Sequence, residues 1–145
     1  MEKIDFNYPK RKNLVVVRAG DKSLHPQWLS AKKNFDIVVS YYGSFPNRYE
    51  EQYDELHLYA GSKWEGIVNF FETRAVDDIC EEYDYVWFPD DDLLTSSENI
   101  DLFFSICKKY EFSIAQPALS KGSFFSWEIT KQVAGLEARC TNFVE

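Results

Sequence analysis

The sequence predicts an α/β fold with a mostly parallel central sheet. Two apolar runs, at residues 14–17 and 35–43, are continuous and rich in β-branched side chains, which is typical of strands covered on both faces. Strand-like runs and helical patterns alternate as far as the acidic stretch that begins at residue 90, which indicates parallel strands joined by helices. Three aspartates follow the fourth strand-like run directly. Because ligands collect beyond the carboxyl ends of strands in open α/β sheets, these aspartates are the first candidate site.

Composition restricts the class of protein. The 145 residues fit one domain, 1–145, with a polar lead-in at 1–12, and 45% hydrophobic residues can form a core. The net charge of −8 argues against nucleic-acid and anionic-membrane partners, which are bound by Lys and Arg. Cys80, Cys107 and Cys140 are odd in number and far apart, so neither a disulfide framework nor a zinc site is expected. Without a signal-like or membrane-spanning segment, we expect a cytoplasmic protein.

The first strand, at residues 14–17, ends in the sequence Arg18-Ala19-Gly20-Asp21. Gly20 allows a loop to approach a ligand closely, and Arg18 is a fixed cation suited to a phosphate or carboxylate. The alternative is an ordinary turn with a solvated arginine, and the residues alone favour that alternative.

Four elements are expected next, in chain order: a short helix at 23–30, a strand at 35–43, a loop at 44–55 and a strand at 56–61. His25 precedes Pro26, which favours a role in a turn over ligation or catalysis. His57 is interpreted as an ordinary strand histidine.

A helix should begin at Ser62, because Glu65 three residues later completes a capping box. Apolar residues at spacings of three and four, from Trp64 to Ile79, predict one apolar stripe that packs in the core. Lys63 occupies the first helical position, where free amides and the helix dipole favour an anion. Surface lysines are common, so Lys63 supports a phosphate site only modestly.

The fourth strand, at residues 85–88, stops at Pro89, and Asp90, Asp91 and Asp92 follow. Adjacent carboxylates repel one another, and a bound Mg²⁺ or Mn²⁺ would remove that cost. The alternative is that aspartates serve a turn or a helix N-terminus. However, a capping box formed by Thr95 and Glu98 would place the helix start beyond them.

A second amphipathic helix is expected at 96–110, with Cys107 on its buried face as a core residue. Strand-like runs then follow at 112–119 and 124–130, with another beginning at 139–145. No helix separates them, so we expect mixed or antiparallel strands after the aspartates.

Several stretches carry a resemblance to a known family: NLVVVRAGDKSLHPQWL, FDIVVSYYG, GSKWEGI, YDYVWFPDDDL, IAQPAL and TNFVE. The chain resembles the GT-A nucleotide-sugar glycosyltransferases and, more closely, the DUF707 family of glycosyltransferase-like proteins. The resemblance implies a three-layer α/β/α sandwich and an Asp-X-Asp motif.

By that resemblance, Asp90 and Asp92 would bind Mn²⁺ or Mg²⁺, and Asp91 would lie with the nucleotide. Two further groups match donor-binding positions, namely the loop Arg18, Ala19, Gly20 and Asp21, and the helix start Gly61, Ser62 and Lys63. The implied activity is metal-dependent transfer of a sugar from a nucleotide-diphospho-sugar to a saccharide-type acceptor.

Family members usually continue beyond the point where this chain ends, so a C-terminally truncated domain is expected. No catalytic base is assigned, and neither Glu128 nor Glu145 is a convincing candidate. One alternative is a non-catalytic nucleotide-sugar-binding or interaction module, which could form a homo-oligomer. The other is a metal-dependent phosphatase or nucleotidyltransferase, which ranks lower because no Gly-rich phosphate loop is present in the sequence.

Overall fold

The computed structural model describes residues 11–144. The chain forms two compact units, Met1–Asp101 and Leu102–Glu145. Most of the predicted lead-in, residues 1–10, and Glu145 lie outside the described residues. That the whole chain is one domain stays a prediction.

The first unit contains a four-stranded sheet in which every pair of neighbouring strands is parallel. In spatial order the strands are β3 (Glu55–Leu58), β2 (Asp36–Tyr41), β1 (Asn13–Ala19) and β4 (Tyr85–Trp87). The two central strands, β1 and β2, are buried along almost their whole length. This arrangement confirms the predicted α/β fold and parallel sheet. Continuous β-branched runs are typical of strands with both faces covered, which is why the sequence predicted buried strands here.

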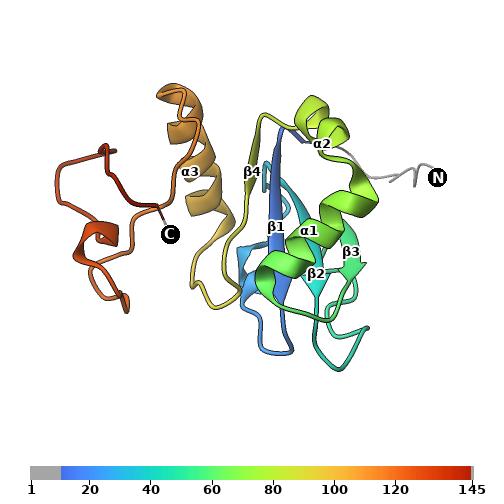
Figure 1. Ribbon diagram of the computed structural model, residues 1–145. Helices are drawn as coiled ribbons and strands as arrows, with labels where there is room; N and C mark the ends of the chain where they lie inside the picture. Colours follow the sequence, from blue (N-terminus) through green and yellow to red (C-terminus); the bar gives the residue numbers. More distant parts are fainter. Residues whose placement is uncertain (1–10, 145) are drawn as a thin grey trace. The chain divides into compact units, whose positions relative to one another are not determined.

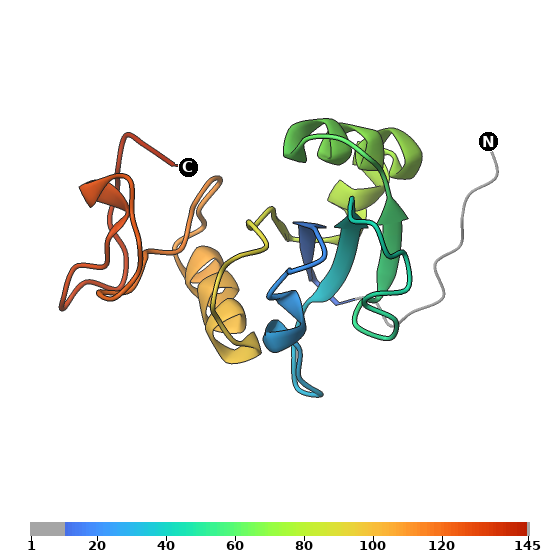
Figure 2. The same cartoon turned by 90° about the horizontal axis from the view of Figure 1, so that it is seen from below.

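Helices cover both faces of this sheet. Helices α1 (Lys63–Arg74) and α2 (Val76–Glu82) lie on one face, and the 3₁₀ turn η1 (His25–Trp28) lies on the other (Figures 1 and 2). Under α1 and α2, Leu14 and Val16 belong to one buried cluster with Phe70 and Ile79. Alternate residues of β1 point to the opposite face, as the two-residue period of a strand requires.

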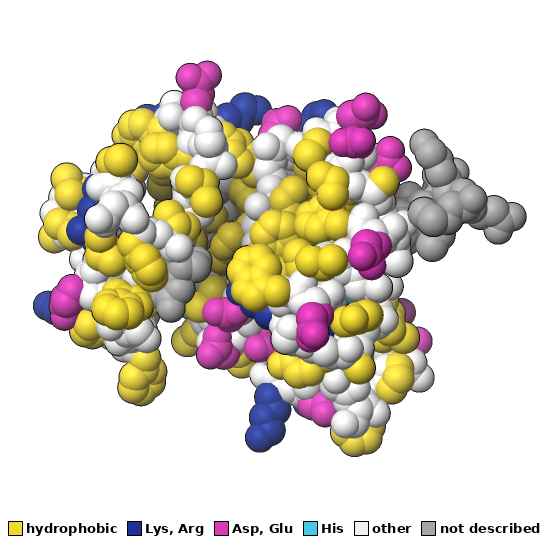
Figure 3. Space-filling view, viewed as in Figure 1, with side chains coloured by type: hydrophobic (Ala, Val, Ile, Leu, Met, Phe, Trp, Pro, Cys, Tyr) yellow, Lys and Arg dark blue, Asp and Glu magenta, His cyan; other side chains and the backbone are white. Residues whose placement is uncertain are grey.

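The predicted apolar stripe from Trp64 to Ile79 was partly wrong. The left-handed backbone of Ala75, with φ 54°, ends α1 and turns the chain into α2. Ile67 and Phe70 are buried three residues apart, whereas Val68 lies one position around the helix and is 56% exposed. Trp64, in the first turn, is 69% exposed. Figure 3 shows hydrophobic side chains gathered over α1, so this helix carries an apolar outer surface as well as a buried one.

Helix α3 (Ser97–Lys109) begins one residue later than its predicted cap implied. The Asn99 amide donates to Ser96 Oγ at 3.4 Å, so Ser96 rather than Thr95 caps the helix. Cys107 is buried, as expected for a core residue. None of the helices in residues 11–144 has both the length and the apolar character that a membrane span requires.

The predicted strands after the aspartates were wrong. Between residues 110 and 144 the structure has one isolated parallel bridge, Leu119 to Lys131, and the 3₁₀ turn η2 (Glu128–Thr130). The runs that resembled strands are instead held by local turns, and Phe124 in one of them is fully exposed. Aromatic and β-branched residues favour a strand only where a neighbouring strand and a packed face exist.

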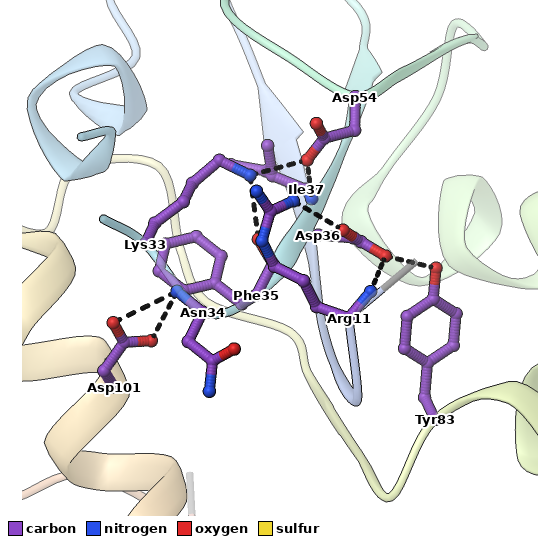
Figure 4. Close-up of polar contacts among 9 residues, drawn as sticks. All are labelled: Arg11, Lys33, Asn34, Phe35, Asp36, Ile37, Asp54, Tyr83 and Asp101. Atoms are coloured by element: carbon purple, nitrogen blue, oxygen red, sulfur yellow. Dashed lines mark hydrogen bonds and ion pairs between the residues drawn. The ribbon is translucent and has the colours of Figure 1, made fainter. Parts of the chain in front are cut away.

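Buried polar contacts close the amino ends of the strands (Figure 4). The Asp36 carboxylate is completely buried and accepts from Arg11 Nη1 at 3.0 Å and from Tyr83 Oη at 3.0 Å. Lys33 and Asp54 form an ion pair of 2.7 Å beside it. The predicted site residues follow the carboxyl ends of the strands, so the candidate site lies at the opposite edge of the sheet from these contacts.

Candidate functional site

The carboxyl edge of the sheet brings together loops that are far apart in the sequence. Three contacts connect them: Gly20 after β1 with Asp91 after β4, Arg18 of β1 with Gly61 after β3, and Lys63 of α1 with Asp90 after β4. Most of the residues predicted for the site thus lie at one edge of the first unit, as expected for parallel strands.

Asp90 and Lys63 form an ion pair at this edge. Lys63 Nζ lies 2.6 Å from Asp90 Oδ1, and the Asp90 side chain is 66% exposed. Lys63 occupies the first position of α1, so its ammonium reaches the acidic loop from the helix start. Asp92 is exposed as well. Both predicted metal ligands are therefore accessible, and one of them already has a cationic partner.

Asp91 is different, because it holds the loop after β1. Its Oδ2 accepts from the Gly20 amide at 2.8 Å, and its carbonyl accepts from the Leu24 amide at 2.7 Å. A side chain at position 20 would meet Tyr42, whose Oη would lie 2.9 Å from the added Cβ. Asp91 and Gly20 therefore have structural roles, and the amide of Gly20 is already used.

Arg18 is 4% exposed and lies beneath the site. Its Nη1 donates to Ser40 Oγ at 2.9 Å and to the Tyr59 carbonyl at 3.0 Å, and its Nη2 donates to the Gly61 carbonyl at 2.6 Å. Burial lowers the pKa of the guanidinium, with partial compensation by Tyr42 and Tyr59. The structure thus shows neither the solvated arginine nor an arginine that is exposed for a ligand.

Neither Ala19 nor Asp21 offers a group that would bind an anion. Ala19 is fully buried in β1. The Asp21 carboxylate accepts a short hydrogen bond from Tyr41 Oη and a longer one from the Ser44 amide, 3.2 Å. The bond from Tyr41 is the largest cause of the lowered pKa of Asp21. Asp21 therefore organises the loop after β2, and Arg48 Nε completes the contact by donating to the Asp21 carbonyl at 2.6 Å.

Ser62 caps α1 as predicted. Ser62 Oγ accepts from the Glu65 amide at 3.4 Å, and Glu65 Oε2 accepts from the Ser62 amide at 2.8 Å, which is a complete capping box. The preceding Gly61 has φ 149°, a conformation that favours glycine. Because the capping box uses two of the amides at this helix start, an anion would depend more on Lys63 than on the backbone.

Sequence reasoning missed a chain of hydrogen bonds that supports this edge. Ser40 Oγ lies 2.7 Å from His57 Nδ1, and His57 Nε2 lies 3.0 Å from Asn69 Oδ1 on α1. Burial lowers the pKa of His57, the Asn69 bond opposes this, and the nearby Arg18 adds to the lowering. A neutral His57 that donates from Nε2 and accepts at Nδ1 satisfies both neighbours. The signal in the sequence was the polar residues within the strands themselves, Ser40 in β2 and His57 in β3, the latter of which was interpreted as an ordinary strand histidine.

The other histidine is buried in the first unit, and Glu128 lies in the second unit. His25 is fully buried beside Tyr49, with ring centroids 4.5 Å apart, and burial lowers its pKa to about 4. It is a packing residue in a turn, as predicted. Glu128 pairs with Lys131 at 3.3 Å in the second unit. Glu145 lies outside the described residues.

At most two of the three aspartates are accessible to a divalent cation. Within residues 11–144, no three His, Cys, Asp or Glu side chains converge to hold a metal ion by themselves. Asp91 is directed to Gly20, which leaves Asp90 and Asp92 as the accessible carboxylates. Mg²⁺ and Mn²⁺ commonly bind through one or two carboxylates, with water and substrate phosphate completing the shell. Two carboxylates therefore suit a metal that arrives with a phosphorylated ligand.

Comparison with known proteins gives a family for this chain. The family described as "Protein of unknown function (DUF707)" matches residues 10–142. The chain belongs to the DUF707 family. This confirms the predicted resemblance at the level of the family. No curated protein and no solved structure matches the chain significantly. A function for this DUF707 chain must therefore be argued from the site itself.

Proposed function

We propose that this chain is a metal-dependent glycosyltransferase of the GT-A type, which binds a nucleotide-diphospho-sugar at the carboxyl edge of the sheet. The observation that carries the proposal is the division of roles in the acidic loop. Asp91 is directed inward to Gly20, while Asp90, which pairs with Lys63, and Asp92 remain exposed. That pattern supports an Asp-X-Asp motif whose two outer carboxylates bind Mn²⁺ or Mg²⁺.

The charges at this edge suit a diphosphate. A divalent cation bound there would stabilise the negative charge that develops on the diphosphate leaving group. Lys63 would supply a second positive charge from the start of α1, where the helix dipole also favours an anion. Asp91 would act by holding the loop of Gly20. The three-layer sandwich of the GT-A fold is part of this proposal.

A non-catalytic binding or interaction module is the second candidate. It is favoured by the second unit, in which many large apolar side chains are exposed. The exposed apolar side chains of residues 110–144 include Tyr110, Ile114, Phe124, Phe125, Trp127 and Leu136. Exposed apolar surface is typical of a protein that packs against a partner or a second copy. A metal-dependent phosphatase or nucleotidyltransferase ranks third.

The test is calorimetric titration of UDP and GDP into the purified chain, with and without Mn²⁺. Wild type is compared with an Asp90→Asn, Asp92→Asn double variant. We expect binding that requires both the metal and the two carboxylates. Lys32→Met, a change at an exposed lysine elsewhere in the first unit, serves as a control and should bind like wild type. Binding that persists without metal or in the double variant would contradict a metal-diphosphate site.

A further inference from the structure

Arg18 has a feature that its packing alone does not require. It is a buried cation, and none of residues 11–144 pairs a carboxylate with it. Its Nε is also buried and has no hydrogen-bond partner among those residues. Burying a charge without a counter-ion is costly, and folds tolerate such a cost mainly where it serves a site.

The acceptors of Arg18 identify what it holds. Nη1 and Nη2 donate to the carbonyls of Tyr59 and Gly61, the residues that connect β3 to α1. The capping residue Ser62 and the site lysine Lys63 follow immediately. The Arg18 guanidinium is thus bonded to the turn from which the first turn of α1 begins.

Two further contacts hold the guanidinium itself. Ser40 Oγ accepts from Nη1 at 2.9 Å and is hydrogen-bonded in turn to His57, which reaches Asn69 on α1. Against the other side lies Gly66, where an added Cβ would be 2.5 Å from Arg18 Cζ. The guanidinium therefore has one tightly defined position, beneath the turn at residues 59–61.

We infer that Arg18 is a positioning residue, which fixes the turn at residues 59–61 and thereby places Lys63 opposite Asp90 for ligand binding. Its uncompensated charge also adds a positive potential at the strand ends, which favours an anion there. The ligand-binding part of this inference rests on the proposed function, but the effect on the turn does not.

The test uses two variants. Arg18→Lys keeps the positive charge but cannot donate to two carbonyls at once in the geometry of a guanidinium, and Arg18→Leu removes both the charge and the donors. The matched controls are Arg74→Lys and Arg74→Leu. Arg74 is also a buried arginine and lies at the far end of α1, where it contacts Glu55. A purely structural role predicts similar losses for the two arginines.

The first measurement is hydrogen exchange of the ligand-free proteins. The Gly66 amide, bonded to the Ser62 carbonyl at 3.0 Å, reports on the first turn of α1. The Ile100 amide, bonded to the Ser96 carbonyl at 3.1 Å in α3, is the reference, because neither arginine contacts it. In the Arg18 variants we expect Gly66 to exchange roughly tenfold faster relative to Ile100, because local opening is then less costly. The Arg74 variants should leave that ratio unchanged. An unchanged ratio in folded Arg18 variants, or the same change in both sets, would overturn the inference.

The second measurement is UDP binding with Mn²⁺ by calorimetry. We expect Arg18→Lys to weaken binding roughly tenfold, as changes to groups that orient ligand-binding residues commonly do. The Arg74 variants should bind within about twofold of wild type. If wild type does not bind UDP or GDP, the proposed function fails, and hydrogen exchange alone decides the role of Arg18.

The Arg18 variants could fail to fold, so Ser40→Ala is a milder second change. It removes one acceptor of Nη1 and the partner of His57, while the carbonyls of Tyr59 and Gly61 remain. Faster relative exchange at Gly66 in Ser40→Ala is the expected result. Wild-type exchange at Gly66 in this variant would overturn the inference even without data on Arg18.

Discussion

The ammonium of Lys63 lies 2.6 Å from a carboxylate oxygen of Asp90, although 27 residues separate them in the sequence. Parallel strands bring the two together, because the helix after β3 and the loop after β4 reach the same edge of the sheet. In the ligand-free protein, Lys63 therefore supplies the positive charge that a metal ion would supply to Asp90. In the proposed function, the metal must displace Lys63, which can then pair with the diphosphate.

Lys63→Met should separate metal binding from nucleotide binding. Without the competing ammonium, Mn²⁺ alone should bind Asp90 up to about fivefold more tightly, the scale of an exposed ion pair. UDP binding in the presence of Mn²⁺ should weaken about tenfold, because a charge-assisted hydrogen bond to phosphate is lost. Calorimetry with each ligand measures both changes.

Lys32→Met again controls for the loss of one surface charge and should leave both affinities near wild type. If Lys63→Met weakened Mn²⁺ binding, or left the UDP affinity unchanged, then Lys63 would not move from Asp90 to the diphosphate on ligand binding, and that step would be ruled out.

The three aspartates should differ in their effect on stability. Asp91→Ala removes the acceptor of the buried Gly20 amide, so we expect a loss of about 1–3 kcal/mol in the free energy of unfolding. Asp91→Asn keeps an acceptor oxygen and should lose less. Asp90→Asn and Asp92→Asn change exposed side chains and should alter stability by no more than about 0.5 kcal/mol. Urea unfolding followed by tryptophan fluorescence gives these values.

The binding results should show the reverse order. Asp90→Asn and Asp92→Asn should abolish metal-dependent UDP binding while the proteins stay as stable as wild type. Equal stability losses at all three positions would mean that the loop after β4 is structural throughout, and the proposed metal site would then lose its support.

The fold was predictable where the pattern of side chains and the packing agree. Buried β-branched runs identified β1 and β2, and the Ser62 capping box located the start of α1. The runs between Tyr110 and residue 144 had a similar composition, but in that described part they form only an isolated bridge. Strand pairing depends on a partner that local sequence does not specify.

The site was predictable as a set of loops, but the roles of its residues were not. The end of a strand is visible in sequence, so Arg18 and Asp91 could be placed at the carboxyl edge. Whether a side chain there points outward or inward depends on neighbours that are distant in sequence. Gly20 turns Asp91 inward, and the carbonyls of Tyr59 and Gly61 hold Arg18 below the surface.

Gly66→Ala should change the sign of its effect when Arg18 is replaced. In wild type, the new methyl group would lie 2.5 Å from Arg18 Cζ, and we expect a loss of about 1–3 kcal/mol from overpacking. Arg18→Leu has no atoms at that place. In that background, Gly66→Ala should stabilise the protein by up to about 1 kcal/mol, because alanine favours a helix more than glycine does.

Urea unfolding of wild type, the two single variants and the double variant measures this coupling. Equal effects of Gly66→Ala in both backgrounds would show that the guanidinium does not occupy the space beside Gly66.

His25 should make the protein less stable as the pH falls below neutrality. Its pKa is lowered from 6.5 to about 4, chiefly because the ring is buried, while the nearby backbone of Gln52 opposes the shift. The unfolded chain therefore takes up a proton near pH 6.5, whereas the folded chain does so only near pH 4. Stability that is present above pH 6.5 is lost between these values, and we expect a loss of about 2 kcal/mol from pH 7 to pH 5.

Urea unfolding at pH 7, 6 and 5 checks this expectation against His25→Asn, which cannot gain the charge. The variant should have a lower free energy of unfolding at pH 7, since it loses packing against Tyr49, but a shallower dependence on pH. His57 titrates in both proteins and cancels in the comparison. If wild type and His25→Asn lost stability equally between pH 7 and pH 5, the pKa of His25 would be the same in the folded and unfolded chains, and the burial of its ring would be wrong.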